Sequence, residues 1–310
     1  QRAASQWLFT KYDALGRVIV TGLYSQAISR PDLQTTLDRE TDLAYNNPAK
    51  PLWEQKIVTG IGYASDAFPQ TIAYYHSINY YDDYDFPVGN TYPFPGKSNM
   101  TRGLPTGSMT TVLGSGNMLL SVIYYDSKGR ALKTFSQHYQ SGAVSAANYD
   151  EVTNEWNFDG SLKDTKREHH VGTNLTTIAS RYEYDHLGRK KESYQKIFTA
   201  PAITATEVKM SSLTYNEIGQ LKSKSLHNGL QTTQYAYNER GWLKSQDATD
   251  MQYSQLLKYN DGTTPQYNGN IANQQYTNGT TTNNIFSYDY DKLNRLLSST
   301  TSNNTMSEVL

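Results

Sequence analysis

A six-residue frame recurs along this chain and limits its possible folds more than any other feature. Each copy begins with an aromatic residue, continues with Asp or Asn, and reaches Gly, or once Asn, four positions after the aromatic residue. Seven copies of one frame indicate an internal repeat, which has to be recognised before any fold is assigned. The copies are Tyr12-Asp-Ala-Leu-Gly-Arg17, Tyr125-Asp-Ser-Lys-Gly-Arg130, Trp156-Asn-Phe-Asp-Gly-Ser161, Tyr184-Asp-His-Leu-Gly-Arg189, Tyr215-Asn-Glu-Ile-Gly-Gln220, Tyr237-Asn-Glu-Arg-Gly-Trp242 and Tyr290-Asp-Lys-Leu-Asn-Arg295.

The residue types of the frame are those of a β-hairpin turn. An Asp or Asn side chain folds back onto nearby backbone amides and starts a turn. Gly supplies the positive φ that a hairpin loop of this length requires, and Asn, which stands at position 294, tolerates the same conformation. The turn residues predicted on this basis are Tyr12, Gly16, Arg17, Tyr125, Asp126, Gly129, Arg130, Tyr184, Asp185, Gly188, Arg189, Tyr215, Gly219, Tyr237, Gly241, Tyr290, Asn294 and Arg295.

The residues on both sides of the frame alternate with a period of two. Examples are Arg181-Tyr-Glu-Tyr184 before a turn and Gly219-Gln-Leu-Lys-Ser223 after one. Alternation around a Gly or Asn turn predicts antiparallel hairpins. No segment has a sustained apolar stripe at the helical period, so we expect helices to be few and short. The predicted fold is therefore all-β, a curved antiparallel sheet of stacked hairpins.

The repeat is regular in one part of the chain and obscure in another. We expect one continuous repeat segment over 1–310, with regular hairpins at 111–300 and a more irregular stretch at 21–110. The irregular stretch holds eight of the ten Pro residues, which indicates loops and edge strands. Its candidate strands are Thr71-Ile-Ala-Tyr-Tyr75 and Ile78-Asn-Tyr-Tyr81. Farther along, Tyr267-Asn-Gly-Asn-Ile271 is predicted to be a tight Asn-Gly turn.

The composition and charge exclude several kinds of partner. Tyr contributes 26 residues against 8 Phe, and a Tyr ring suits a half-buried position with a hydrated hydroxyl. The net charge is −1 with neither sign gathered into a block, so we expect no nucleic-acid partner and no attraction to an anionic membrane. The longest apolar stretch, 118–125, is far shorter than the roughly 20 residues that cross a bilayer, so no membrane insertion is expected.

The absence of Cys and the first residue indicate where such a chain belongs. With no Cys, disulfides and thiolate metal sites are excluded. A Cys-free chain rich in Asn, Thr, Ser and Tyr is typical of a bacterial secreted or cell-surface protein. The chain begins with Gln1 and has no signal peptide, so we expect it to be an internal piece of a longer polypeptide.

The frame Tyr-Asp-x-x-Gly-Arg resembles the YD repeat of the Rhs (rearrangement hot spot) proteins, which also occurs in insecticidal toxin complex C components and animal teneurins. The stretches 80–86, 101–107 and 122–130 are similar to the variant found in Bacteroidota Rhs-like surface proteins. The resemblance runs from about Trp7 to Leu297, nearly the whole chain.

The resemblance implies a spiralling sheet that forms part of a hollow β-shell, which in polymorphic toxins encloses a variable C-terminal toxin. The self-cleaving segment of such proteins carries an Asp-Pro motif, and no Asp-Pro pair occurs here. Neither an autoprotease nor a toxin is therefore assigned to this chain. The partners implied are the rest of its own polypeptide, an enclosed cargo domain and a secretion apparatus.

The repeated Tyr and Arg residues have a functional and a structural interpretation. The six frame Tyr residues suit a sugar-binding array, but their fixed place beside the turn favours a ladder that packs neighbouring hairpins together. The four frame Arg residues could contact anions. We expect each to lie over a neighbouring Tyr ring or to pair with a turn carboxylate such as Asp13, Asp126, Asp185 or Asp291.

Two further groups were considered as metal ligands. Asp82, Asp83 and Asp85 lack the 12-residue loop of a Ca²⁺ site, so a solvated turn is the preferred interpretation. His169 and His170 could bind a metal, but nothing nearby completes a ligand set, and the other His residues are scattered, so a polar strand or loop is the preferred interpretation. No nucleophile elbow or phosphate-binding loop is present. We expect no catalytic residues, no cofactor and no metal, and hence not an enzyme.

The function expected from the sequence is a structural β-shell segment, a cage or scaffold of a secreted or surface-exposed protein, enclosing or presenting a C-terminal toxin or effector. One alternative is a cell-surface adhesion or carbohydrate-binding module that uses exposed Tyr rings on surface glycans. A second is a hydrolase within 21–110, which would require a deep pocket lined by two or more carboxylates.

Overall fold

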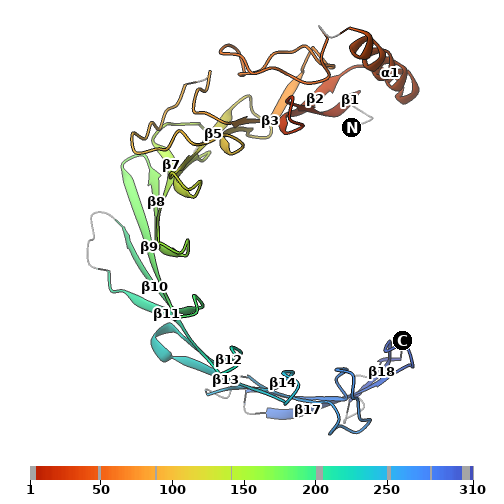
Figure 1. Ribbon diagram of the computed structural model, residues 1–310, viewed down its shortest axis with the longest axis vertical. Coiled ribbons are helices and arrows are strands. Elements are labelled where there is room, and N and C mark those ends of the chain that lie inside the picture. Colours follow the sequence, from red (N-terminus) through yellow and green to blue (C-terminus); the bar gives the residue numbers. More distant parts are fainter. Residues whose placement is uncertain are drawn as a thin grey trace. The chain divides into compact units, whose positions relative to one another are not determined.

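Figure 1 shows a computed structural model of the chain, which describes residues 5–47, 50–87, 89–140, 142–199, 205–249, 253–279, 281–301 and 308–309. It divides into two compact units. Unit 1 comprises Gln1–Ala179 and Phe198–Thr204, and unit 2 comprises Ser180–Ile197 and Ala205–Leu310. The expectation of one continuous segment over 1–310 stays a prediction.

The described residues of the first half of the chain form nine strands and a helix. They are β1 (Gln6–Tyr12), β2 (Val18–Ser25), α1 (Arg30–Asn46), β3 (Tyr74–Tyr81), β4 (Pro105–Thr111), β5 (Met118–Tyr125), β6 (Ala131–Gln137), β7 (Asn148–Trp156), β8 (Leu162–Val171) and β9 (Asn174–Tyr184).

The described residues of the second half form ten strands and a 3₁₀ turn. They are β10 (Lys190–Thr199), β11 (Val208–Tyr215), β12 (Leu221–Leu226), η2 (His227–Gly229), β13 (Gln231–Tyr237), β14 (Leu243–Ala248), β15 (Tyr253–Lys258), β16 (Asn273–Asn278), β17 (Thr281–Tyr290), β18 (Leu296–Thr301) and β19 (Glu308–Val309).

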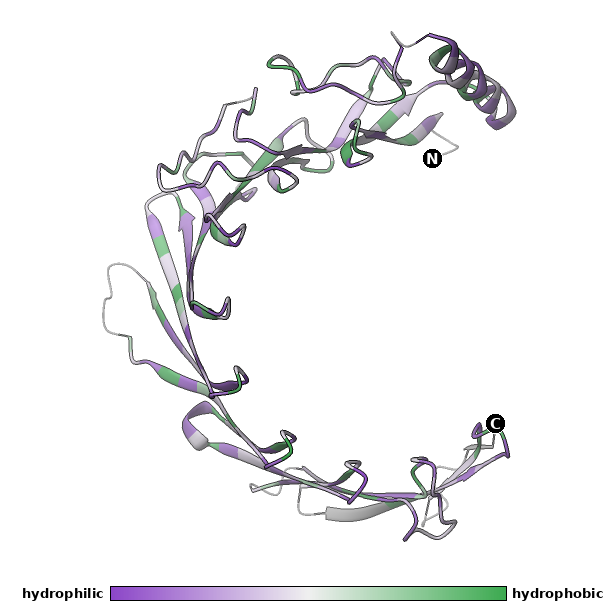
Figure 2. Ribbon diagram, viewed as in Figure 1, coloured by the Kyte–Doolittle hydropathy of each residue, from purple (hydrophilic) through white to green (hydrophobic). Residues whose placement is uncertain are grey.

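Each strand pairs antiparallel with the strand that follows it in sequence. This holds from β1 to β8 in unit 1 and from β10 to β19 in unit 2. Each frame turn joins an odd-numbered strand to the next even-numbered one. The frame turns of a unit therefore all lie at the same end of its strands (Figure 1). Hydrophilic and hydrophobic residues alternate in bands along the strands (Figure 2). The expected all-β antiparallel sheet of hairpins is confirmed.

Unit 1 has a second layer over one face of its sheet. Residues 51–73 and 82–104, which we call the cover segments, pack rings such as Tyr63, Phe86 and Tyr92 onto the strands. Tyr63 stacks on Tyr80 with 6.0 Å between ring centroids, and Tyr92 stacks on Phe135 at 5.1 Å. Burial raises the pKa of Tyr80 to about 12. The aromatic core of unit 1 therefore depends on segments without regular structure.

A buried ion pair holds the first cover segment against the β1 strand. Lys11 Nζ lies 2.6 Å from Glu54 Oε1 and also donates to the carbonyl of Ala67 at 2.9 Å. Glu54 accepts from the backbone N–H groups of Asp66 (2.9 Å) and Ala67 (3.2 Å). The Lys11 and Glu54 side chains are only 3% and 0% exposed. Both charges are thus paired and hydrogen-bonded, as burial requires.

The helix α1 corrects the expectation that helices would be short, because it has 17 residues. Ser29 caps its first turn by accepting from the N–H of Asp32, and Pro31 stands in that turn. None of its residues is buried, so it has no need of an apolar stripe. A search for periodicity could not find it, whereas the Ser-x-Pro-Asp start signal at 29–32 could.

The prediction of edge strands in the Pro-rich stretch is wrong. β3 pairs with β2 and β4, and β4 pairs with β3 and β5, so both lie inside the sheet. Of the Pro residues in that stretch that the structure describes, Pro105 opens β4 and Pro31 lies in α1, and the others fall in irregular segments, where no ladder N–H is needed. The candidate strand at 78–81 belongs to β3, whereas Thr71–Ala73 lies outside it.

Within the described residues, none of the helices combines the length and the hydropathy that crossing a membrane requires.

Candidate functional site, the row of aromatic turns

Each frame folds into the same turn. In the turn between β9 and β10, the N–H of Asp185 donates to the carbonyl of Arg189 at 2.9 Å, and the N–H of Gly188 donates to the carbonyl of Asp185 at 3.0 Å. Gly188 has φ +75° and Asn294, its counterpart in the last copy, has φ +63°. The same two bonds close the turns that begin at Asp13, Asp126, Asn157, Asn216, Asn238 and Asp291.

The side chain after the aromatic residue caps the turn. Asp185 Oδ1 accepts from the N–H groups of Leu187 and Arg189, both at 2.9 Å, and Oδ2 accepts from Arg189 Nε at 2.7 Å. Burial alone would raise the pKa of Asp126, but hydrogen bonds from the backbone and side chain of Arg130 outweigh burial and lower that pKa below its usual range. The turns of Asp13, Asp126 and Asp291 have the same bonds as Asp185.

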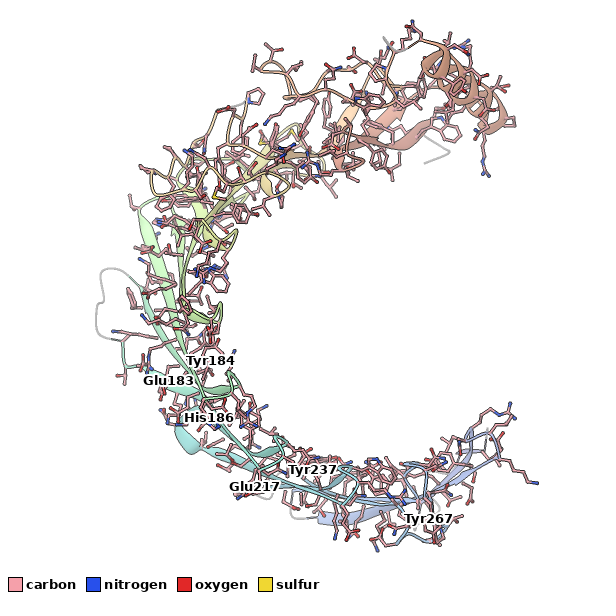
Figure 3. All side chains as sticks on the ribbon, in the orientation of Figure 1. Glu183, Tyr184, His186, Glu217, Tyr237 and Tyr267 are labelled. Carbon is pink, nitrogen blue, oxygen red and sulfur yellow. The ribbon has the colours of Figure 1, made fainter. Side chains whose placement is uncertain are left out.

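A hydrogen bond from the frame aromatic residue joins a hairpin to the preceding one, and it is seen at Tyr125, Trp156, Tyr215, Tyr237 and Tyr290. The Tyr237 hydroxyl donates to the carbonyl of Leu221 at 3.0 Å, and Leu221 is the second residue after the preceding turn Gly, Gly219. Figure 3 shows Tyr184 and Tyr237 beside turns of unit 2. Trp156 makes the same joint with its indole N–H, to the carbonyl of Ala131 at 3.0 Å. The other donor–acceptor pairs are Tyr81–Val18, Tyr125–Pro105, Tyr215–Lys190, Tyr259–Leu243 and Tyr290–Ile271.

Where the residue after the turn Gly is Arg or Trp, it can cover the aromatic ring of the next hairpin. The guanidinium carbon of Arg17 lies 4.4 Å from the Tyr81 ring centroid, and that of Arg189 lies 4.2 Å from the Tyr215 ring. Where Trp242 replaces Arg, its ring lies 5.0 Å from the Tyr259 ring. Arg295 pairs with Asp291 and is 75% exposed. Arg17, Arg130 and Arg189 thus have both contacts expected of frame Arg residues, the turn carboxylate and the neighbouring ring, whereas Arg295 has the carboxylate contact alone among the described residues.

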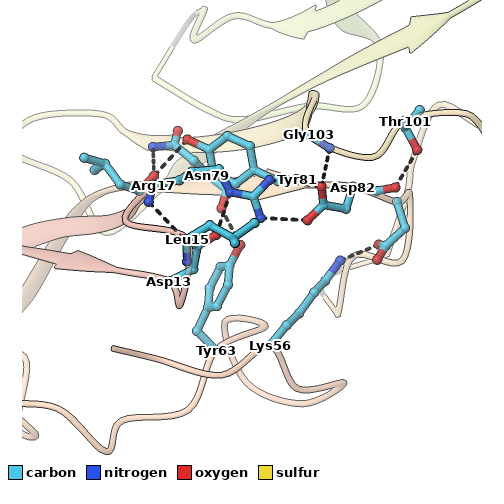
Figure 4. Close-up of polar contacts among 12 residues, drawn as sticks. Asp13, Leu15, Arg17, Lys56, Tyr63, Asn79, Tyr81, Asp82, Thr101 and Gly103 are labelled. Atoms are coloured by element: carbon cyan, nitrogen blue, oxygen red, sulfur yellow. Dashed lines mark hydrogen bonds and ion pairs between the residues drawn. The ribbon is translucent and has the colours of Figure 1, made fainter. Parts of the chain in front are cut away.

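Two of the joints belong to turns that the sequence pattern did not reveal. The first begins at Tyr81 and Asp82 and resumes at Gly103, with φ +85°, after an insertion that forms the second cover segment. The N–H of Asp82 donates to the carbonyl of Leu104 at 3.1 Å, and Asp82 Oδ1 accepts from the N–H of Gly103 at 2.6 Å (Figure 4). Tyr81 pairs with Pro105 as Tyr12 pairs with Val18.

The second interrupted turn runs from Tyr259 to Gly269, which has φ +103°. Residues 259–272 connect β15 to β16, whose pairing starts at Lys258 and Asn273. The prediction of a tight Asn-Gly turn at 267–271 as the connection of a hairpin is therefore wrong. Asn268 and Gly269 instead end a longer insertion, after which Ile271 accepts from the Tyr290 hydroxyl. The fixed spacing of the frame does not reveal these two turns, because their Gly no longer lies four residues after the aromatic residue.

Two of the three acidic residues after Tyr81, Asp82 and Asp83, are held by cations, which differs from the solvated turn expected from the sequence, whereas Asp85 is exposed. Asp82 makes a two-pronged contact with Arg17, whose two terminal nitrogens lie 3.0 and 2.7 Å from its carboxylate oxygens. Asp83 pairs with Lys56. Hydrogen bonds from Arg17 lower the pKa of Asp82 below its usual range, against the effect of burial. Asp82 therefore fastens the second cover segment to the first hairpin, and Asp83 fastens it to the first cover segment.

A pocket beside this contact is lined by three carboxylates, those of Asp13, Glu54 and Asp82. Each of them is already ion-paired, Asp13 and Asp82 with Arg17 and Glu54 with Lys11. A glycosidase acid needs a carboxyl whose pKa is raised, and the pKa of Asp82 is lowered. The pocket thus has the residue types of the second alternative function, but its Asp82 does not have the raised pKa of a glycosidase acid.

The expectation of scattered His residues is wrong, because two of them come together in the folded chain. His138, Asp150 and His169 lie together on one face of the unit 1 sheet, with potential metal-ligand atoms all within 4.8 Å of one another. Sequence analysis missed this group because its members belong to three neighbouring strands or their ends. His170 lies on the opposite face, stacked on Tyr149 at 4.3 Å.

Comparison with known proteins finds distant likenesses among solved structures. A crystal structure of TcdB2-TccC3 without its hypervariable C-terminal region is 12% identical, with a TM-score of 0.44, and a crystal structure of TcdB2-TccC3-Cdc42 is 13% identical, with a TM-score of 0.33. Each match covers 96% of this chain, which spans 15% of the other chain's length. No family profile and no curated protein matches the sequence. Both TM-scores are below 0.5, so the fold assignment rests on the strands and turns themselves.

Proposed function

We propose that this chain is a non-enzymatic scaffold, a segment of the wall of a YD-repeat β-shell in a secreted or surface-exposed bacterial protein. Its partners would be the remainder of its own polypeptide, a C-terminal toxin or effector that the shell encloses or presents, and a secretion apparatus. Nucleic acid and membrane lipid have no part in this function, since the charges of the chain are balanced and dispersed.

One observation supports the scaffold more than any other. The side chains that define the repeat already make contacts within their own hairpin or with a neighbouring one. The aromatic residue donates to the preceding hairpin, the Asp or Asn caps its own turn, and the Arg covers the next ring. A binding or catalytic repeat would keep such groups available for a ligand, whereas here they set the spacing and orientation of successive hairpins.

The test uses the natural polypeptide that carries this segment, treated with a nonspecific protease. We expect the part enclosed by the repeats to resist digestion when the repeats are intact. A double variant, Tyr215→Ala with Tyr237→Ala, removes two neighbouring joints and should expose that part to cleavage. Lys222→Ala, on an exposed side chain between the same hairpins, is the matched control. Equal digestion of all three proteins would rule out enclosure.

The adhesion alternative is favoured by a different set of rings. Tyr253, Tyr276, Phe286 and Tyr288 form a row of half-buried, nearly parallel rings on strands of unit 2, with centroids 6.0–6.4 Å apart. Glycans bind to such rings by stacking. A glycan array probed with the wild-type chain and with Tyr253→Ala tests this, with Tyr12→Ala as control. Binding lost only in Tyr253→Ala would support adhesion.

A further inference from the structure

A cluster of two imidazoles and one carboxylate spans three neighbouring strand segments of unit 1. His138 directly follows β6, Asp150 belongs to β7 and His169 to β8. Asp150 pairs with His169 across the β7–β8 ladder and with Ser136 across the β6–β7 ladder. Since His138 is two positions after Ser136, all three side chains point to the same face of the sheet. The rings of His138 and His169 stack with 4.7 Å between centroids.

The hydrogen bonds around the cluster orient its donor atoms. His138 Nε2 lies 3.0 Å from the carbonyl of His170, which can only accept, so this nitrogen carries the hydrogen and Nδ1 keeps a free lone pair. Asp150 Oδ1 lies 2.7 Å from His169 Nδ1, and Oδ2 accepts from Arg167 at 2.7 Å.

We propose that His138, Asp150 and His169 bind a divalent transition-metal ion of the Zn²⁺ type, which ties the end of β6 to β7 and β8. Two imidazoles and one carboxylate are a ligand set that Zn²⁺ accepts, with a fourth position for water. Ca²⁺ and Mg²⁺ prefer oxygen ligands throughout, so this set disfavours them.

The geometry requires only a small adjustment. At metal–ligand distances of about 2.0–2.2 Å, tetrahedral donor atoms lie roughly 3.4 Å apart. The ligand atoms now lie up to 4.8 Å from one another, and side-chain rotation would bring them to that tetrahedral distance without moving the strands. His169 is 42% exposed and Asp150 22% exposed, which leaves an open approach for the ion. Arg167, on the outer carboxylate oxygen, would hold Asp150 in place as an outer partner of the metal ligand.

The proposal is tested by calorimetric titration of the 310-residue chain with ZnCl₂. We expect one Zn²⁺ per chain, with affinity lowered about 100-fold or more in His138→Gln and in His169→Gln. His186→Gln, an exposed His in a turn of unit 2, is the control and should bind as the wild type does. Saturating Zn²⁺ should raise the Tm of unit 1 by about 5 °C in the wild type and not in the two ligand variants. Undiminished binding in the ligand variants, or no binding by the wild type, would overturn the proposal.

A second measurement does not depend on the folding of any variant. Wild-type chain is treated with diethyl pyrocarbonate, which modifies accessible imidazole, in the presence and absence of ZnCl₂, and the modified sites are mapped by mass spectrometry. Zn²⁺ should protect His138 and His169 and leave His186 reactive. Equal modification of all three residues with and without Zn²⁺ would contradict the site.

Discussion

Unit 1 and unit 2 are built from the same turn but bury their residues in different ways. In unit 1 the cover segments lie over one face of the sheet, and the core includes fully buried rings such as Tyr80 and Tyr124. In the described part of unit 2, buried side chains are few, and Leu257, Tyr259, Ala272 and Asn273 gather where a frame turn is interrupted. Elsewhere its strands are tied by hydroxyl pairs such as Thr214–Ser223 at 2.6 Å.

The difference shows what an interrupted turn contributes. The Tyr81–Gly103 interruption supplies Phe86 and Tyr92 to the core of unit 1, and the shorter Tyr259–Gly269 interruption coincides with the burial in unit 2. An uninterrupted hairpin has no inserted residues that could form a second layer. Its stability depends on its turn and its cross-strand pairs. Residue burial therefore follows the insertions, while the turn geometry is the same in both units.

The largest effect is expected from breaking the buried ion pair of unit 1. Glu54→Gln leaves the Lys11 ammonium buried without a countercharge and should lower the free energy of unfolding by about 3–5 kcal/mol. Lys56→Gln, which removes the exposed pair with Asp83, should cost less than about 1 kcal/mol. Urea unfolding followed by Trp fluorescence measures both, because Trp7, Trp53 and Trp156 lie in unit 1. Equal costs would mean that the cover segment is not held by this pair.

A comparison of two Phe residues tests whether only unit 1 has a second layer. Phe86→Ala empties a place between Tyr80 and the strand at Gly107 and should cost about 3–5 kcal/mol. Phe286→Ala, on a half-buried ring of unit 2, should cost less than half as much. Hydrogen exchange read by mass spectrometry assigns each loss to its unit. A Phe286→Ala cost as large as that of Phe86→Ala would reveal a further covering layer over unit 2.

The frame residue Gly188 should tolerate substitution less well than Gly116, because of these two only Gly188 has a positive φ. Gly188→Ala forces a side chain into the left-handed region and should destabilise its hairpin by about 1–2 kcal/mol. Gly116→Ala, in the open connection between β4 and β5, has free space around the new methyl group and should change stability by less than about 0.5 kcal/mol. Thermal unfolding measures both. If Gly188→Ala has no effect, the positive φ does not limit this turn.

The smallest effect is expected at a single joint. Tyr237→Phe keeps the ring and removes the hydrogen bond to Leu221, which should cost about 1 kcal/mol. Tyr12 has no hydroxyl partner among the described residues, so Tyr12→Phe should leave the unfolding free energy unchanged. A double-mutant combination with Tyr215→Phe tests whether neighbouring joints add. Equal unfolding free energies for Tyr237→Phe and Tyr12→Phe would show that the Tyr237 hydroxyl does not stabilise the contact between hairpins.

The local turn was predictable from the sequence, and its long-range partners were not. Asp185 and Gly188 lie within one six-residue window, so their chemistry alone implies the bend. The carbonyl that accepts from Tyr237 lies 16 residues away, and nothing in the residue type of Leu221 marks it, because any residue offers a backbone carbonyl. The turn at Tyr81 escaped for the same reason, since its two halves are separated by the second cover segment.

The joint between hairpins has a consequence for how such a wall changes over time. Its acceptor is a main-chain oxygen at a set place after the bend, and its donor is one ring, so neither depends on the sequence between the capping residue and the Gly. Whole hairpins can therefore be duplicated or lost without altering the joints of their neighbours. New sequence can likewise be inserted into a turn. The insertions at Asp82 and Tyr259 mark two positions where added sequence has already been accommodated, and they suggest where foreign peptides can be displayed by design.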